Sequence, residues 1–150
     1  MYRRTLAAAL TGMLVLATTT PASAGNCRYG EVEIDSVRAS LRSNFDGYRL
    51  NVRYDVELEN LDPSRYVLLV NFSERGRLLR DHRGYPLEVV ADFLRPTDVD
   101  DGEYEFKDRF SLNLSRCAVQ YPRHLKVHAK VVDRYNGSIV ARKWKWVRRW

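Results

Sequence analysis

The sequence predicts an all-β protein, an antiparallel sandwich of two sheets with about seven strands, immunoglobulin-like in the broad sense. Several segments alternate apolar and polar residues with period two, as half-buried strands do. Glycine, proline, aspartate and asparagine separate these segments, and turns favour those residues. No helical period of useful length follows the first 24 residues. Together these observations favour two packed sheets.

The first predicted strand covers residues 31–41 and changes phase in its middle. Val32 and Ile34 share one phase, whereas Val37, Ala39 and Leu41 share the other. A change of phase of this kind indicates a β-bulge, because one extra residue moves the following side chains to the opposite face.

The clearest strand is predicted at residues 48–59, where five apolar residues alternate with five polar ones. Residues 65–73 are apolar on both faces, which is typical of a central strand. The remaining predicted strands are residues 77–81, 85–91, 104–114, 125–135 and the segment after Gly137.

The first 24 residues have the pattern of a cleavable secretory signal peptide. Arg3 and Arg4 precede an apolar run of about a dozen residues, and Ala-Ser-Ala at 22–24 fits a cleavage site. We therefore expect one exported β-sandwich domain at residues 25–150, periplasmic or secreted, with no transmembrane segment in the mature chain. A lipoprotein acylated at Cys27 is the alternative, although Asn26 fits such a cleavage site poorly.

The two cysteines, Cys27 and Cys117, predict one disulfide. An even number of cysteines in an exported chain favours a disulfide, and two cysteines allow one intramolecular pairing. The bond would tie the N-terminus of the mature chain to the segment that follows residues 104–114.

The C-terminal sequence ARKWKWVRRW predicts the second strand of a hairpin. Asn136-Gly137 is a strong signal for a two-residue type I′ turn, which would place Tyr135 opposite Ser138. In that register Trp144 lies opposite Ala129 and Trp146 opposite Val127, so both indoles belong to the core. The other face then gathers the basic residues Lys126, His128, Lys130, Lys143, Lys145 and Arg149.

That basic face is the candidate binding site that the sequence offers. An anionic glycan, a lipid head group or an acidic protein would suit it. The whole chain has a formal charge of +6, but five cations lie in the last ten residues, so the rest is near neutral. Nucleic acid is disfavoured, because the predicted face has no exposed aromatic residue on which bases could stack.

Other chemistry has weaker support in the sequence, and we expect no cofactor. Asp98, Asp100, Asp101 and Glu103 surround Gly102 and form a weak calcium candidate, but their spacing does not fit the helix-loop-helix calcium pattern. No nucleophile elbow, phosphate loop or Cys-x-x-Cys motif is present. A non-catalytic exported binding module is the main hypothesis. An enzyme or metal-dependent module with scattered site residues is the alternative, and a small outer-membrane β-barrel is a minor one.

Overall fold

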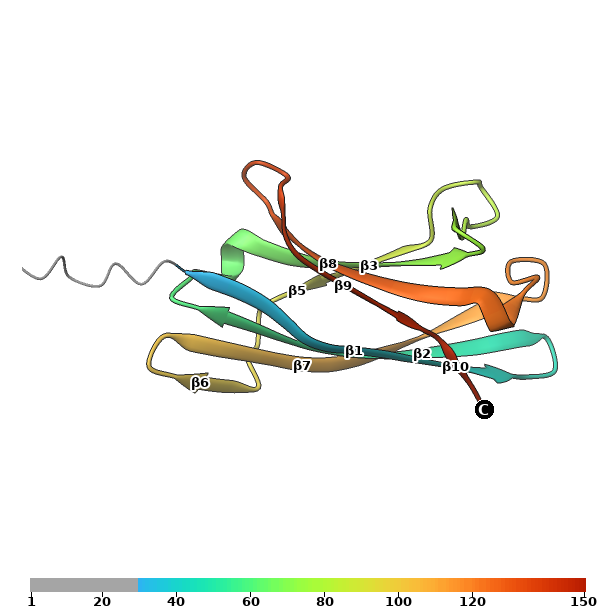
Figure 1. The fold of residues 1–150 in the computed structure, drawn as a ribbon, viewed down its shortest axis with the longest axis horizontal. Helices are drawn as coiled ribbons and strands as arrows, with labels where there is room; N and C mark the ends of the chain where they lie inside the picture. The colour runs from blue at the N-terminus through green and yellow to red at the C-terminus, as the bar shows by residue number, and fades with distance from the viewer. Residues whose placement is uncertain (1–29) are drawn as a thin grey trace, which may run out of the picture.

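A computed structural model describes residues 30–150, which form two five-stranded sheets packed face to face (Figure 1). The predicted two-sheet antiparallel sandwich is confirmed. The predicted signal peptide at residues 1–24 and Cys27 lie outside the described residues. None of the helices in the described part of the chain is long and apolar enough to span a membrane.

Sheet A has the strand order β10-β1-β2-β7-β6. Its three long strands are 13 residues each and form an antiparallel block about 40 Å long, at about 3.3 Å per residue. The strands are β1 (Glu31–Ser43), β2 (Gly47–Glu59), β6 (Asp98–Asp100), β7 (Glu103–Ser115) and β10 (Arg148–Arg149).

Sheet B has the order β4-β3-β8-β9, and β5 also pairs with β3. The central strand β3 is buried along most of its length, as the apolar run at residues 65–73 predicted. The strands are β3 (Tyr66–Glu74), β4 (Arg77–Leu78), β5 (Glu88–Asp92), β8 (Leu125–Asp133) and β9 (Ile139–Trp146). Two short 3-10 helices, η1 (Pro63–Arg65) and η2 (Pro122–His124), precede β3 and β8.

The core lies between the sheets and consists of the inward-facing residues of both. From Leu50 onward in β2 and throughout β8, every second side chain is buried, because successive residues of a strand point to opposite faces. Among the largest fully buried side chains are Phe72, Leu41, Leu50, Leu58, Leu68 and Leu125.

The predicted bulge in β1 is confirmed, since the pairing of β1 with β2 shifts between Glu33 and Ser36. Lys143 of β9 stabilises this region. Its Nζ donates hydrogen bonds to the carbonyl oxygens of Ile34, at 2.7 Å, and Asp35, at 2.8 Å. After β9 the chain passes through the buried Val147 and crosses to sheet A, where β10 pairs with β1 in parallel (Figure 1).

The hairpin register predicted from Asn136-Gly137 is wrong by one residue. His128 pairs with Trp144, and Lys126 pairs with Trp146. The loop is longer than two residues, because Gly137 N donates to Asp133 O at 2.8 Å and Asp133 N donates to Ser138 O at 2.9 Å. Of the turn pair only Gly137 has a positive φ, whereas a type I′ turn needs two such residues.

The one-residue shift exchanges the two faces of β9. Trp144 and Trp146 point outward instead of into the core, and each is 51% exposed. Ala141 and Lys143 take the inner positions, where β9 packs against β1.

Candidate functional site

The basic face predicted from the sequence does not exist as one surface. Lys126, His128 and Lys130 lie on the outer face of β8, but Lys143 and Lys145 pair with Ala129 and Val127 and so share the inner side of sheet B. The ammonium of Lys143 is engaged by the β1 bulge. Arg149 belongs to β10, on sheet A.

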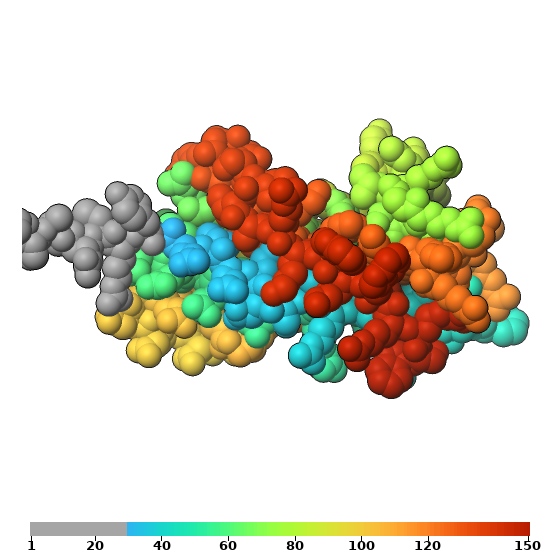
Figure 2. All heavy atoms as spheres, in the orientation of Figure 1, coloured from blue at the N-terminus to red at the C-terminus, as the bar shows by residue number. Residues whose placement is uncertain are grey.

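The shift assembles a different surface on sheet B, which we call the tryptophan face. It combines three residues of β8 with three of β9 in directly opposed pairs: Lys126 with Trp146, His128 with Trp144, and Lys130 with Arg142. In Figure 2 the C-terminal segment, in dark red, runs over the surface of the molecule. The sequence reasoning missed Arg142, Trp144 and Trp146 as surface residues. The expectation that this face has no exposed aromatic residue, which was the ground for disfavouring nucleic acid, is therefore wrong.

Lys126 organises the two indoles of the tryptophan face. Its Nζ lies 4.4 Å from the ring centroid of Trp144 and 4.4 Å from that of Trp146. The two rings meet edge to face, with centroids 6.2 Å apart and planes at 88°. Cation–π and edge-to-face contacts both restrict ring motion. The result is a positioned aromatic pair with a cation between its members.

His128 lies beside this pair and is held by β3. Its Nε2 is 2.7 Å from Ser73 Oγ. Burial, reinforced by the positive charges of Lys130 and Lys126, lowers the pKa of His128 below its ordinary value of 6.5. Asn71, opposite His128 on β3, is buried, and its Oδ1 has no hydrogen-bond partner among the described residues. The tryptophan face therefore includes an imidazole whose pKa is lowered, and the amide oxygen of Asn71 beside it has no hydrogen-bond partner among the described residues.

The lowered pKa of His128 predicts a pH dependence of stability. Below about pH 6.5 the unfolded chain binds a proton that the folded chain resists, so the free energy of unfolding should fall as the pH drops from about 7.5 to about 5.5. Chemical denaturation at several pH values would measure the slope. His128→Gln should flatten it. Equal slopes in the wild type and His128→Gln would contradict this role.

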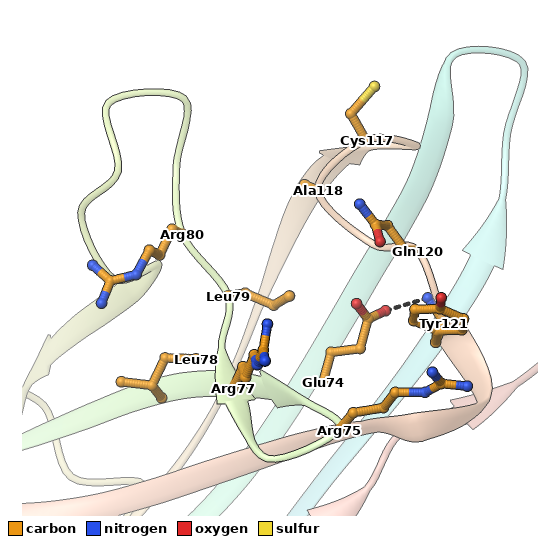
Figure 3. A pocket seen from close by; sticks show the side chains of 10 residues that line it. All are labelled: Glu74, Arg75, Arg77, Leu78, Leu79, Arg80, Cys117, Ala118, Gln120 and Tyr121. Atoms are coloured by element: carbon orange, nitrogen blue, oxygen red, sulfur yellow. Dashed lines mark hydrogen bonds between the residues drawn. The ribbon is translucent and has the colours of Figure 1, made fainter.

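A second feature of the surface is a hollow of about 620 Å³ at the end of sheet B near β4 (Figure 3). Glu74 accepts a hydrogen bond from the backbone N–H of Tyr121, and the guanidinium of Arg75 lies 3.5 Å from the centroid of the Tyr121 ring. The thiol of Cys117 lies at the rim, and none of the described side chains hydrogen-bonds to it. These contacts anchor the segment that precedes β8, and they place no general base beside the thiol.

The structure does not support the predicted disulfide between Cys27 and Cys117. Cys27 lies outside the described residues, and four residues of chain, the separation of Cys27 from Glu31 in the sequence, span at most about 14 Å. Glu31 pairs with Glu59, and Ser115 pairs with Gly47, at opposite ends of β2 and so about 40 Å apart (Figure 1). Disulfide Cα atoms lie within about 7 Å of each other.

We therefore expect the two cysteines not to pair within one chain. A thiol assay on the unfolded mature protein, purified without reductant, should find two free thiols per chain. A monomer with no reactive thiol would restore the disulfide.

The calcium candidate is divided between a turn and the outer face of sheet A. Asp98 and Asp100 pair with Glu105 and Glu103, and Asp101 occupies the turn with a φ of 38°. Within residues 30–150, the carboxylates whose oxygens gather within 4.8 Å of one another are instead Asp35, Asp55 and Glu105. Lys107 neutralises part of this group through ion pairs with Asp55 and Glu105.

No model of a known protein family matches this sequence, and no curated protein sequence is significantly similar to it.

Proposed function

We propose that the chain is an exported, non-catalytic β-sandwich module, immunoglobulin-like in the broad sense, that binds an anionic glycan of the cell envelope or the extracellular space through its tryptophan face. Export is argued from the signal-peptide pattern of residues 1–24. The observation that carries the binding proposal is the ammonium of Lys126 between two half-exposed indoles, with Lys130 and Arg142 in the adjacent pair.

This combination suits a charged sugar polymer. The electron-rich face of an indole attracts the C–H groups of a sugar ring, and ammonium and guanidinium groups form charge-assisted hydrogen bonds with carboxylates. Trp144 and Trp146 are two residues apart on one strand, so they lie in line along an open sheet face that an extended chain can follow.

Charge and shape favour a glycan over the other candidates for this face. In the row of paired residues that crosses sheet B through His128, the nearest acidic residue is Glu88 of β5. The strand β3 lies between Glu88 and His128. The indoles lie on a flat sheet face instead of projecting from a loop tip, as insertion into a bilayer interface would favour. A flat basic and aromatic surface is therefore better matched to a polymer that lies along it.

The proposal is tested by binding of the mature protein to immobilised polygalacturonate, with dextran as the uncharged reference. Trp144→Ala/Trp146→Ala should weaken binding by about tenfold or more, about 1.4 kcal/mol, because it removes both indole faces that would contact the sugar rings. Lys126→Gln should also weaken it. Binding should fall as salt rises, since exposed charges are screened.

Two variants provide matched controls. Trp150→Ala removes an exposed indole outside the tryptophan face, and Lys145→Gln removes a cation from the inner side of β9; neither should change binding. Equal losses of glycan binding in these two control variants would show that binding does not depend on the tryptophan face. Binding to vesicles that contain phosphatidylglycerol, without binding to polygalacturonate, would show that the ligand of the tryptophan face is a lipid surface and not a glycan.

A further inference from the structure

The outer face of sheet A separates its charges into an acidic half and a basic half, and we call it the bipolar face. Two adjacent rows across the sheet consist only of carboxylates: Glu31, Glu59, Glu103 and Asp100 in the first, and Glu33, Glu57, Glu105 and Asp98 in the second. Beyond Asp55 the sign reverses. Arg38, Arg53 and Arg109 form one row, and Arg42 pairs with Arg49 farther along.

These charges are poorly neutralised within the chain. Among the described residues, the ion pairs on this face run only from Lys107 to Asp55 and Glu105. Like charges that lie directly opposite each other on neighbouring strands destabilise a sheet. Partial burial and the neighbouring Glu103 raise the pKa of Glu57, which shows the same repulsion. Soluble surfaces usually intersperse the two signs, so their separation here calls for a partner.

We infer that the bipolar face is a docking surface for a second copy of this chain, in an antiparallel dimer with two-fold symmetry. The two-fold axis would lie in the plane of the interface, perpendicular to the strands and close to Asp55. The strands of the second copy then run antiparallel to those of the first. This arrangement brings the acidic row of Glu33, Glu57 and Glu105 of each copy onto the arginine row of Arg38, Arg53 and Arg109 of the other. Glu57 then meets Arg53 of the second copy, and Glu33 meets Arg38. Such an interface is self-complementary and closed, as two-fold dimers require.

The dimensions of the face are sufficient for a reversible dimer. The three long strands extend about 40 Å, and at about 4.8 Å per strand they give about 15 Å of width, so each copy would bury about 600 Å². The total of about 1,200 Å² lies at the lower end of specific interfaces. Arg49, Arg53 and Arg109 line a shallow hollow on the basic half. Because the contacts would be between charged side chains, we expect the association to be weak and sensitive to salt.

Sedimentation of the mature protein at low and high salt tests this inference. At about 0.01 M salt, where screening extends over ~30 Å, the protein should sediment as a dimer, and at about 1 M salt, where it extends over ~3 Å, as a monomer. Arg38→Glu/Arg53→Glu makes the arginines that meet Glu33 and Glu57 of the second copy acidic, and Glu33→Lys/Glu57→Lys makes those two carboxylates basic. Each variant alone should be monomeric at low salt, because side chains of like charge now meet at these positions of the two copies.

Mixing the two variants is the decisive step, since positions 33, 38, 53 and 57 are all acidic in one variant and all basic in the other. An equimolar mixture should recover a dimer that contains one chain of each variant. Arg77→Glu/Arg83→Glu, which reverses two exposed arginines elsewhere, should dimerise like the wild type. A wild type that stays monomeric at low salt, or a mixture that does not associate, would overturn the inference. The tryptophan face belongs to the other sheet, so glycan binding can succeed or fail independently.

Discussion

Phe72→Ala should lower the free energy of unfolding by about 3 to 5 kcal/mol, the cost typical of truncating a buried aromatic residue. Phe72 is fully buried on β3, opposite Val127 of β8, and reaches the centre of the core between the sheets. The loss combines the apolar area exposed and the cavity that the surrounding strands cannot close. Urea denaturation followed by circular dichroism would measure it.

Trp144→Ala should by contrast cost about 1 kcal/mol or less, although it removes a larger side chain. The indole is half exposed, and its loss removes mainly the contacts with Lys126 and Trp146. The register with Trp144 opposite Ala129 would instead make the two substitutions equally damaging. Comparable losses for Phe72→Ala and Trp144→Ala would therefore contradict the observed pairing of β8 with β9.

Gly47→Ala should destabilise the fold by an amount near the upper end of the range for overpacking, about 1–3 kcal/mol. Gly47 is buried at the start of β2 and pairs with Ser115. A Cβ atom there would lie 2.2 Å from the carbonyl oxygen of Leu114, a backbone atom that cannot move without separating β2 from β7. Thermal denaturation would report the loss.

Gly137→Ala is the matched control, because that glycine has a φ of 70° and a Cβ atom added there would have no neighbour within 4 Å. Only backbone strain applies there, at about 1 kcal/mol. A smaller loss for Gly47→Ala than for Gly137→Ala would mean that the ends of β2 and β7 are not as closely paired as described.

Local patterns in the sequence were sufficient to predict most strands. The alternation of residues 48–59 and the apolar run at 65–73 correspond to β2 and β3, and the change of phase at residues 31–41 corresponds to the bulge in β1. The short strands β6 and β10 were missed. With three and two residues they carry no periodicity of their own, and pairing with β7 and β1 defines them.

The candidate site was harder to predict, because its faces depend on one turn. A strand that alternates lysine and tryptophan fits either register by its pattern alone. The turn was decided by Asp133, whose carboxylate accepts hydrogen bonds from Arg65 and from the backbone N–H of Tyr135. Arg65 lies far away in sequence, so the longer loop had no local signal. The bipolar face likewise appears only when β1, β2 and β7 are aligned.

The most direct test of the central claim is the fluorescence of Trp144 and Trp146 in a Trp150→Phe variant, which leaves these two indoles as the only tryptophans. During titration with polygalacturonate, their emission should change saturably and acrylamide should quench them less, while dextran should have no effect. Emission and quenching that respond to neither polymer, or equally to both, would contradict the claim that the tryptophan face binds an anionic glycan.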